Sequence, residues 1–221
     1  MSGSLAPLSP VPPPSDFNDI DPLVVQWVAG REIVRVYDHT FGPTNFNPGR
    51  GARIMGRFHF FADAAGSVVP VLYGSDRNDG AIAETVFHDV PTRSAVRVVP
   101  AGRLKNLSIV SLSPQRDLRL VELRGFGLTR LRLAAANLTD TEASEYPNTV
   151  PWAKALHDAF PDADGLLWMS RRFNAAEALV LFGTRVAPGD LAITSPPLPL
   201  AIGPGREKVD DAANRADILV S

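Results

Sequence analysis

The segment Pro70–Val90, with the sequence PVLYGSDRNDGAIAETVFHDV, decides the fold because it changes from one hydrophobic period to another. Residues 68–74 form a nearly continuous apolar run that has the length of a buried β-strand. After this run, Asp76 or Asp79 can cap a helix over about residues 80–89. The sequence therefore predicts a strand that leads directly into a helix.

The predicted helix turns one acidic side chain away from its apolar face. Ile82 and Val86 lie about one turn apart and mark the face that we expect to be buried. At 3.6 residues per turn, Glu84 lies about 200° around the helix axis from both of them. Tyr73 ends the preceding strand, and side chains that leave the ends of strands commonly meet in a cleft.

Apolar runs on both sides of this segment predict further elements. We expect strands over residues 32–37, 55–61, 107–112, 118–123, 165–170 and 178–183, with a final edge segment over 191–200. We expect helices over residues 127–134 and 149–160, and a short helix or turn over 22–29. Strands with a few interspersed helices indicate an α+β fold with mixed β-sheets rather than regular βαβ winding.

Length and composition indicate one folded domain with irregular ends. The chain has 221 residues, of which 45% are hydrophobic and 21% charged, and this excludes collagen, coiled coils and wholesale disorder. We expect the domain over residues 17–200. The proline-rich segment 1–16 is expected to be extended or disordered, and residues 201–221 are expected to form a polar tail.

The net charge, and the absence of signal-peptide features, long apolar runs and cysteine, limit the class and location that we expect for the protein. A net charge of −2 argues against a dedicated nucleic-acid-binding protein, which usually carries a basic excess. The N-terminus lacks the features of a signal peptide and no run of 18 apolar residues occurs, so we expect a cytoplasmic location and no membrane contact. Because the chain has no cysteine, it can form neither a disulfide nor a thiolate metal site.

The basic residues are unusual in kind, because 19 of the 22 are arginine. Arginine binds phosphate through two parallel hydrogen bonds, so a phosphate-bearing ligand is one explanation. A GC-rich genome, whose codons favour arginine, is the simpler explanation. The sequence alone leaves both open.

Several common catalytic motifs are absent from the sequence. It contains no P-loop, no dinucleotide-binding glycine pattern, no H-E-x-x-H and no G-x-S-x-G. The four histidines are scattered along the chain. We therefore expect neither a metal site nor a serine hydrolase.

Four positions stand out on local grounds. Arg57 directly follows a Gly-rich loop, and Tyr73 and Glu84 belong to the strand–helix segment. Ser170 ends the apolar run GLLWMS and precedes Arg171 and Arg172. Taken singly, each has an ordinary structural explanation, such as a surface arginine or a strand-ending serine.

Taken in order, these positions resemble the RES domain family. The matching stretches are GARIMGRFHFF with Arg57, PVLYGSDRNDGAIAETVFHDV with Tyr73 and Glu84, and DGLLWMSRRFNAAEALVLFG with Ser170. Arg35 in VRVYDHT also fits the opening of the family pattern. The family usually has Gly-Gly-Arg-Trp-Asn where this chain has Met-Gly-Arg-Phe-His, with a longer turn before the tyrosine.

The resemblance implies a fold similar to ADP-ribosyltransferases and a reaction on NAD+. It implies a toxin that splits NAD+ with inorganic phosphate into nicotinamide and ADP-ribose 1″-phosphate, neutralised by an Xre-type helix-turn-helix antitoxin. NAD+ and phosphate would then be substrates, and no cofactor is implied. The alternatives are an NAD+ glycohydrolase, a mono-ADP-ribosyltransferase that modifies a protein, and a catalytically silent binding module.

The resemblance also implies roles for the matching residues. Arg57, Glu84 and Ser170 would be the catalytic residues, and Arg35, Arg57, Tyr73 and Ser170 would bind NAD+. The arginines would contact phosphate oxygens, and the carboxylate would stabilise positive charge on the ribose. The tyrosine would stack beside nicotinamide or form the pocket wall, and the serine would bind a phosphate or ribose oxygen. Arg171 or Arg172 could complete the anion site.

Overall fold

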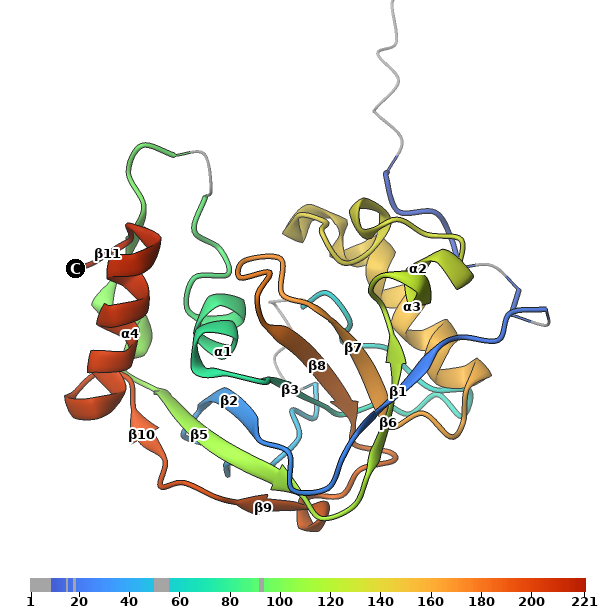
Figure 1. The fold of residues 1–221 in the computed structure, drawn as a ribbon, viewed down its shortest axis with the longest axis horizontal. Coiled ribbons are helices and arrows are strands. Elements are labelled where there is room, and N and C mark those ends of the chain that lie inside the picture. The colour runs from blue at the N-terminus through green and yellow to red at the C-terminus, as the bar shows by residue number, and fades with distance from the viewer. Residues whose placement is uncertain (1–8, 15, 18, 50–55, 92–93) are drawn as a thin grey trace, which may run out of the picture.

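A curved nine-stranded sheet organises the molecule (Figure 1). The computed structural model describes residues 9–14, 16–17, 19–49, 56–91 and 94–221. The sheet has the order β1-β6-β7-β8-β3-β2-β5-β10, and β9 pairs with β5. Its strands are β1 (Val24–Trp27), β2 (Ile33–Asp38), β3 (Val71–Ser75), β5 (Leu107–Pro114), β6 (Leu118–Glu122), β7 (Gly165–Met169), β8 (Glu177–Phe182), β9 (Leu191–Ile193) and β10 (Leu198–Pro199).

The strand pairing is mixed. Strands β6 and β7 run parallel, whereas β7–β8, β8–β3, β3–β2 and β2–β5 are antiparallel. Two further strands, β4 (Val98–Val99) and β11 (Leu219–Val220), form a small parallel pair. The predicted α+β fold with mixed sheets is confirmed. The likeness to ADP-ribosyltransferases stays a prediction.

Helices cover two regions of the sheet (Figure 1). Helices α1 (Asn78–Thr85) and α4 (Gly203–Ala216) lie at one end, and α2 (Phe126–Arg130) and α3 (Tyr146–Ala159) lie at the other. Short 3₁₀ turns are η1 (Ala101–Leu104), η2 (Ala135–Asn137), η3 (Ala143–Glu145) and η4 (Pro188–Asp190). No helix in the described part of the chain has the length and apolarity that crossing a membrane requires.

The central strands are buried on both faces, which explains their continuous apolar sequences. Along β8, Ala178, Val180 and Phe182 pack into the cluster that includes α3. Leu179 and Leu181 pack into a second cluster on the opposite face. A third cluster lies between α1, α4, β2 and β5, and includes Ile82, Val86 and Val209. The predicted buried face of α1 is therefore confirmed.

Two predicted elements near the N-terminus are wrong. Residues 24–27 form strand β1 rather than the expected short helix or turn, because they pair with β6 at the edge of the sheet. Residues 56–61 form a loop rather than a strand, and Met55 lies outside the described residues. Both edges of β3 are already paired, with β2 and β8, so this loop cannot join the sheet beside β3. Its Phe58 and Phe61 are buried in the core instead.

The start of α1 also differs from the prediction. The helix begins at Asn78, and its N-cap is Arg77, whose side chain makes no capping hydrogen bond. Asp76 instead accepts a hydrogen bond from the backbone N–H of Glu177, at 3.0 Å. Asp79 lies in the first turn, where its negative charge complements the helix dipole.

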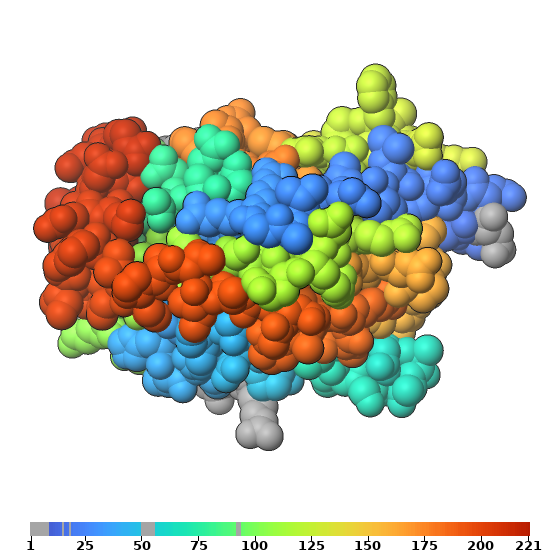
Figure 2. Space-filling model, turned by 60° about the horizontal axis from the view of Figure 1, so that its bottom comes forward, coloured from blue at the N-terminus to red at the C-terminus, as the bar shows by residue number. Residues whose placement is uncertain are grey.

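The polar tail expected after residue 200 is wrong over most of its length, because Gly203–Ala216 form α4 (Figure 1). Val209, Ala212 and Ala213 recur at helical spacing and are buried, although the helix is polar overall. The guanidinium of Arg215 binds both carboxylate oxygens of Asp79, at 2.7 Å each, and ties α4 to α1. In Figure 2, the red atoms of this segment cover one end of the molecule.

Part of the proline-rich N-terminal segment is packed rather than free. The side chain of Val11 is buried, and the carbonyl of Pro12 accepts a 2.7 Å hydrogen bond from Trp152 Nε1 in α3. The prediction of disorder for residues 1–8 and 15 lies outside the described residues.

Candidate functional site

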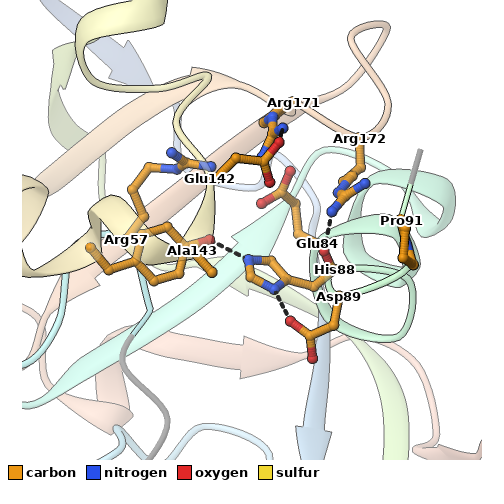
Figure 3. A pocket seen from close by; sticks show the side chains of 10 residues that line it. Arg57, Glu84, His88, Asp89, Pro91, Glu142, Ala143, Arg171 and Arg172 are labelled. Atoms are coloured by element: carbon orange, nitrogen blue, oxygen red, sulfur yellow. Dashed lines mark hydrogen bonds and ion pairs between the residues drawn. The ribbon is translucent and has the colours of Figure 1, made fainter. Parts of the chain in front are cut away.

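Two adjoining cavities form one cleft beside α1. The first, which we call the wide chamber, has a volume of about 480 Å³ and extends from β2 and β3 toward η1 and the start of β5. The second, the narrow chamber, has a volume of about 340 Å³ and is shown in Figure 3. The side chains that border both chambers are Arg57, Glu84, His88, Asp89 and Tyr146.

Glu84 is held in the cleft by Ser170. Ser170 follows the last residue of β7 and is fully buried. Its hydroxyl donates a 2.6 Å hydrogen bond to Glu84 Oε1 and accepts one of 3.0 Å from the backbone N–H of Phe173. Because the hydroxyl is held by a backbone donor, it fixes the carboxylate in one orientation. Ser170 itself borders a third cavity, of about 380 Å³, and reaches the other two through Glu84.

Arg57 is a buried cation beside this carboxylate, with 5% of its surface exposed. Its Nη1 donates to the carbonyls of Leu138 and Thr141, at 3.1 Å each, and to Thr141 Oγ1 at 2.5 Å. Its guanidinium carbon lies 5.3 Å from the centre of the Tyr146 ring. Burial lowers the pKa of Arg57, and the neighbouring Tyr146 and Glu84 act in the opposite direction.

Tyr73 lies in the middle of β3, not at its end, and forms part of the wall of the wide chamber. Its hydroxyl accepts a 3.1 Å hydrogen bond from the backbone N–H of Phe58 and lies 2.9 Å from His59 Nδ1. Burial raises the pKa of Tyr73 far above its usual value, so the phenol stays neutral at physiological pH.

Arg35 lies on β2 and, of the two adjoining chambers, borders only the wide one in the described residues. It is 7% exposed, and its Nη1 donates a 2.6 Å hydrogen bond to the carbonyl of Pro43. Burial lowers the pKa of Arg35 to about 10, against a smaller opposing effect of Tyr37. The guanidinium therefore stays charged at neutral pH and borders the wide chamber.

The fold thus brings the predicted residues together from distant parts of the chain. Arg35, Arg57, Tyr73 and Glu84 line the cleft directly. Ser170 contributes from behind Glu84.

A chain of hydrogen bonds along the cleft was missed by the sequence analysis. His88 Nδ1 lies 2.8 Å from Asp89 Oδ1 (Figure 3), and His88 Nε2 is hydrogen-bonded to the hydroxyl of Tyr146. His88 follows Glu84 by four residues, the spacing of neighbours on one face of the helix expected over residues 80–89. This signal could have revealed it, although α1 itself ends at Thr85. Tyr146 lies 58 residues further along the chain, so no local pattern indicates it.

Both arginines after Ser170 line the narrow chamber, but they differ in their contacts. Arg171 donates from Nη1 to the carbonyl of Thr141, at 3.0 Å, and forms an ion pair with Glu142. Arg172 donates to the carbonyls of Val90 and His88 and so supports the turn after α1. Arg171 thus contributes charge to the chamber, and Arg172 also has a structural role.

The chain matches a known protein family over most of its length. The chain matches the RES domain over residues 32–202, a range that contains every residue of the cleft named above. No curated protein matches the chain. The matched range begins just before β2 and ends just before α4. Because this match spans well over half of the sequence, the chain belongs to the RES domain family.

Proposed function

We propose that the protein cleaves NAD+ with inorganic phosphate, which yields nicotinamide and ADP-ribose 1″-phosphate. The observation that carries this proposal is the Glu84 carboxylate, held at 2.6 Å by the buried Ser170 where the two chambers meet. Membership of the RES domain family supports the same conclusion. The wide chamber would receive NAD+.

The reaction explains why an oriented carboxylate is useful. The bond between the anomeric carbon of the ribose and the nicotinamide nitrogen breaks, and its electron pair neutralises the pyridinium. Positive charge therefore moves onto the ribose until a phosphate oxygen forms the new bond to carbon. Hydrogen phosphate releases its proton to solvent as the sugar phosphate forms. Glu84 would stabilise the positive charge and hydrogen-bond a ribose hydroxyl.

The other candidate residues would bind and position NAD+. Arg35 and Arg57 carry buried charges that a phosphate group can partner. Tyr73 would form a wall beside the nicotinamide ring. Ser170 would act through Glu84, because it is fully buried and its oxygen is already held by Phe173.

In the cell, the proposed activity would make the protein a toxin that depletes NAD+ in the cytoplasm. An Xre-type helix-turn-helix antitoxin would neutralise it. Expression in bacteria tests this part directly, because growth should stop and co-expression of an adjacent helix-turn-helix gene should restore it. Growth arrest by the Glu84→Gln variant as well would contradict the proposal.

The purified chain, free of antitoxin, should be incubated with NAD+ in the presence and absence of inorganic phosphate, with products identified by phosphorus NMR. We expect loss of NAD+ only with phosphate, together with a new sugar-phosphate signal. Glu84→Gln should lower the rate roughly 10²–10³-fold, the usual cost of one electrostatic contact to a transition state. Glu207→Gln, at an exposed site on α4, is the matched control.

Other outcomes identify the alternatives. Radioactive label from NAD+ that stays on protein indicates a mono-ADP-ribosyltransferase, in which a protein group replaces phosphate as the acceptor. Loss of NAD+ without phosphate indicates hydrolysis. No loss and no labelling, from a folded sample, indicates a silent binding module.

A further inference from the structure

We propose that the narrow chamber binds the acceptor oxyanion, inorganic phosphate, and that the carboxylate of Glu142 occupies this place until phosphate displaces it. The inference rests on the proposed function for the fate of the phosphate, but the binding itself can be measured without NAD+. It assigns the attacking group to a chamber separate from the one proposed for NAD+.

Two guanidinium groups meet at one carbonyl in this chamber. Arg57 and Arg171 both donate to the carbonyl oxygen of Thr141, at 3.1 and 3.0 Å. Two positive charges held this close repel one another, and this arrangement lowers the pKa of Arg57 in addition to the larger effect of burial. An anion placed between them would relieve that repulsion.

Arg57 has donors left for such an anion. In the described part of the structure, its hydrogen bonds all leave from Nη1. Nε and Nη2 of Arg57 make no hydrogen bond in this part of the structure, and neither belongs to the fully buried polar atoms without a partner. These two nitrogens are therefore accessible, and the cavities that Arg57 borders are the two chambers of the cleft. They can donate in parallel to two oxygens of one oxyanion.

The carboxylate of Glu142 already binds the second arginine, Arg171. Both oxygens of Glu142 contact Arg171, with Oε2 3.0 Å from Nη1 (Figure 3). The hydrogen bond from Arg171 lowers the pKa of the Glu142 carboxyl, and the charges of Arg172 and Arg57 act in the same direction. Three arginines thus stabilise negative charge at this point. A bidentate contact of this kind is also the geometry in which arginine binds phosphate.

The ion pair between Glu142 and Arg171 is weak enough for phosphate to displace the Glu142 carboxylate. The side chain of Glu142 is 65% exposed, and ion pairs of such exposed groups are weak. A phosphate dianion carries more charge and more acceptor oxygens than a carboxylate. It should therefore replace Glu142 on Arg171 and bind the free donors of Arg57 as well.

The position of the chamber fits an acceptor. Glu84 borders both chambers, so an anion in the narrow one lies beside the group that would hold the ribose. Of the described residues, Arg35 belongs to the wide chamber alone and remains available for the pyrophosphate of NAD+. NAD+ in the wide chamber and phosphate in the narrow chamber would then approach Glu84 from different sides.

Binding of inorganic phosphate to the full chain, measured by calorimetry or by phosphorus NMR line width without NAD+, tests the inference. Glu142→Gln should bind phosphate about two- to fivefold more tightly, because a weak competing ion pair is removed. Arg171→Gln should bind it at least about tenfold more weakly, because a charge-assisted contact is lost.

Two matched control variants distinguish the effect of a direct contact at the phosphate site from the effect of a change in overall charge. Asp140→Asn removes an exposed negative charge two residues from Glu142. Its carboxylate acts on Arg171 through charge but forms no hydrogen bond to it in the described structure. Arg119→Gln removes an exposed positive charge on β6. Asp140→Asn should tighten phosphate binding less than Glu142→Gln does, and Arg119→Gln should bind phosphate as the wild type does. All four variants should keep the wild-type thermal midpoint.

The outcomes distinguish this inference from the proposed function. Equal phosphate affinity in the wild type, Glu142→Gln and Arg171→Gln overturns the inference, even if NAD+ is consumed in a phosphate-dependent way. The expected order of affinities without any NAD+ turnover supports the chamber as an oxyanion site and overturns the proposed reaction. A shift of equal size in Asp140→Asn would also overturn the inference, because it would show a general charge effect.

Discussion

The hydroxyl of Ser170 donates a 2.6 Å hydrogen bond to Oε1 of Glu84, across 86 residues of the chain. This contact joins the end of β7 to α1 and sets the direction of a carboxylate in the cleft. Taken singly, each residue has an ordinary structural explanation. Their pairing makes the strand end and the helix parts of one site.

Replacing Ser170 by alanine tests this pairing. We expect kcat for NAD+ cleavage to fall at least about tenfold, because the carboxylate loses a charge-assisted hydrogen bond. The free energy of unfolding should fall by about 1–3 kcal/mol, since the N–H of Phe173 loses its acceptor. Steady-state kinetics and urea unfolding measure both, with Ser113→Ala, a largely buried serine on β5, as the control. Unchanged kcat in a folded Ser170→Ala variant would show that the contact is only structural.

Arg35 should affect the two substrates differently. Because it borders the wide chamber, Arg35→Gln is expected to raise the KM for NAD+ at least about tenfold through loss of a charge-assisted phosphate contact. The KM for phosphate should stay the same. Kinetics with each substrate varied in turn give both values, and Arg119→Gln controls for the loss of charge. Equal increases in both KM values would contradict this separation of sites.

The ion pair between α1 and α4 predicts a pH dependence of stability. The hydrogen bond from Arg215 holds the pKa of Asp79 below its ordinary value in the folded protein, against a smaller effect of burial. This contribution is complete above the ordinary pKa of aspartate, about 3.9, and is lost as the pH falls through the lower folded value. The pair is partly exposed, so we expect a contribution of about 0.2–1 kcal/mol.

Urea unfolding of the wild type and Asp79→Asn between pH 7 and pH 3 measures this contribution. The two free energies of unfolding should differ at neutral pH and converge as the pH falls. A constant difference over the whole range would contradict the assignment of the effect to Asp79.

The C-terminal helix should contribute to stability although it lies beyond the matched family range. Val209 is fully buried, so Val209→Ala should lower the free energy of unfolding by about 1.5–3 kcal/mol. The same change at Val96, which is 71% exposed, should have little effect. Equal effects at the two sites in urea unfolding would indicate that α4 is not part of the folded core.

Two buried tryptophans differ in one hydrogen bond. Trp152 Nε1 donates to the carbonyl of Pro12, whereas Trp168 Nε1 has no partner in the described structure. Both side chains are about 1% exposed, so replacement by phenylalanine removes similar buried volume. Trp152→Phe should therefore lower the free energy of unfolding by about 1 kcal/mol more than Trp168→Phe. The reverse order would mean that the indole of Trp168 gains a partner in solution.

The elements that hydrophobic period alone could predict are those whose apolar pattern matches their burial. The strands at 33–38, 107–114 and 177–182 and the helix at 146–159 satisfy this condition, as does the position of Glu84 away from the buried face of α1. The loop of residues 56–61 is different. Its Phe58 and Phe61 are buried as in a strand, but the segment does not pair with the sheet. A local pattern records burial, but it does not record which strand edges are still free.

The types and order of the candidate residues were therefore present in the sequence. Arg57, Tyr73, Glu84 and Ser170 stand out on local grounds, and the resemblance to the RES domain family adds Arg35. Their distances were not present in the sequence, because the chain brings β2, β3, α1 and the end of β7 together only through the strand order of the sheet. The same holds for Tyr146, the first residue of α3, and for Glu142 in the segment before that helix, which both join the cleft. Hydrophobic period is a property of neighbours in the chain, whereas a binding site depends on contacts between segments that only the packed sheet and helices bring into reach.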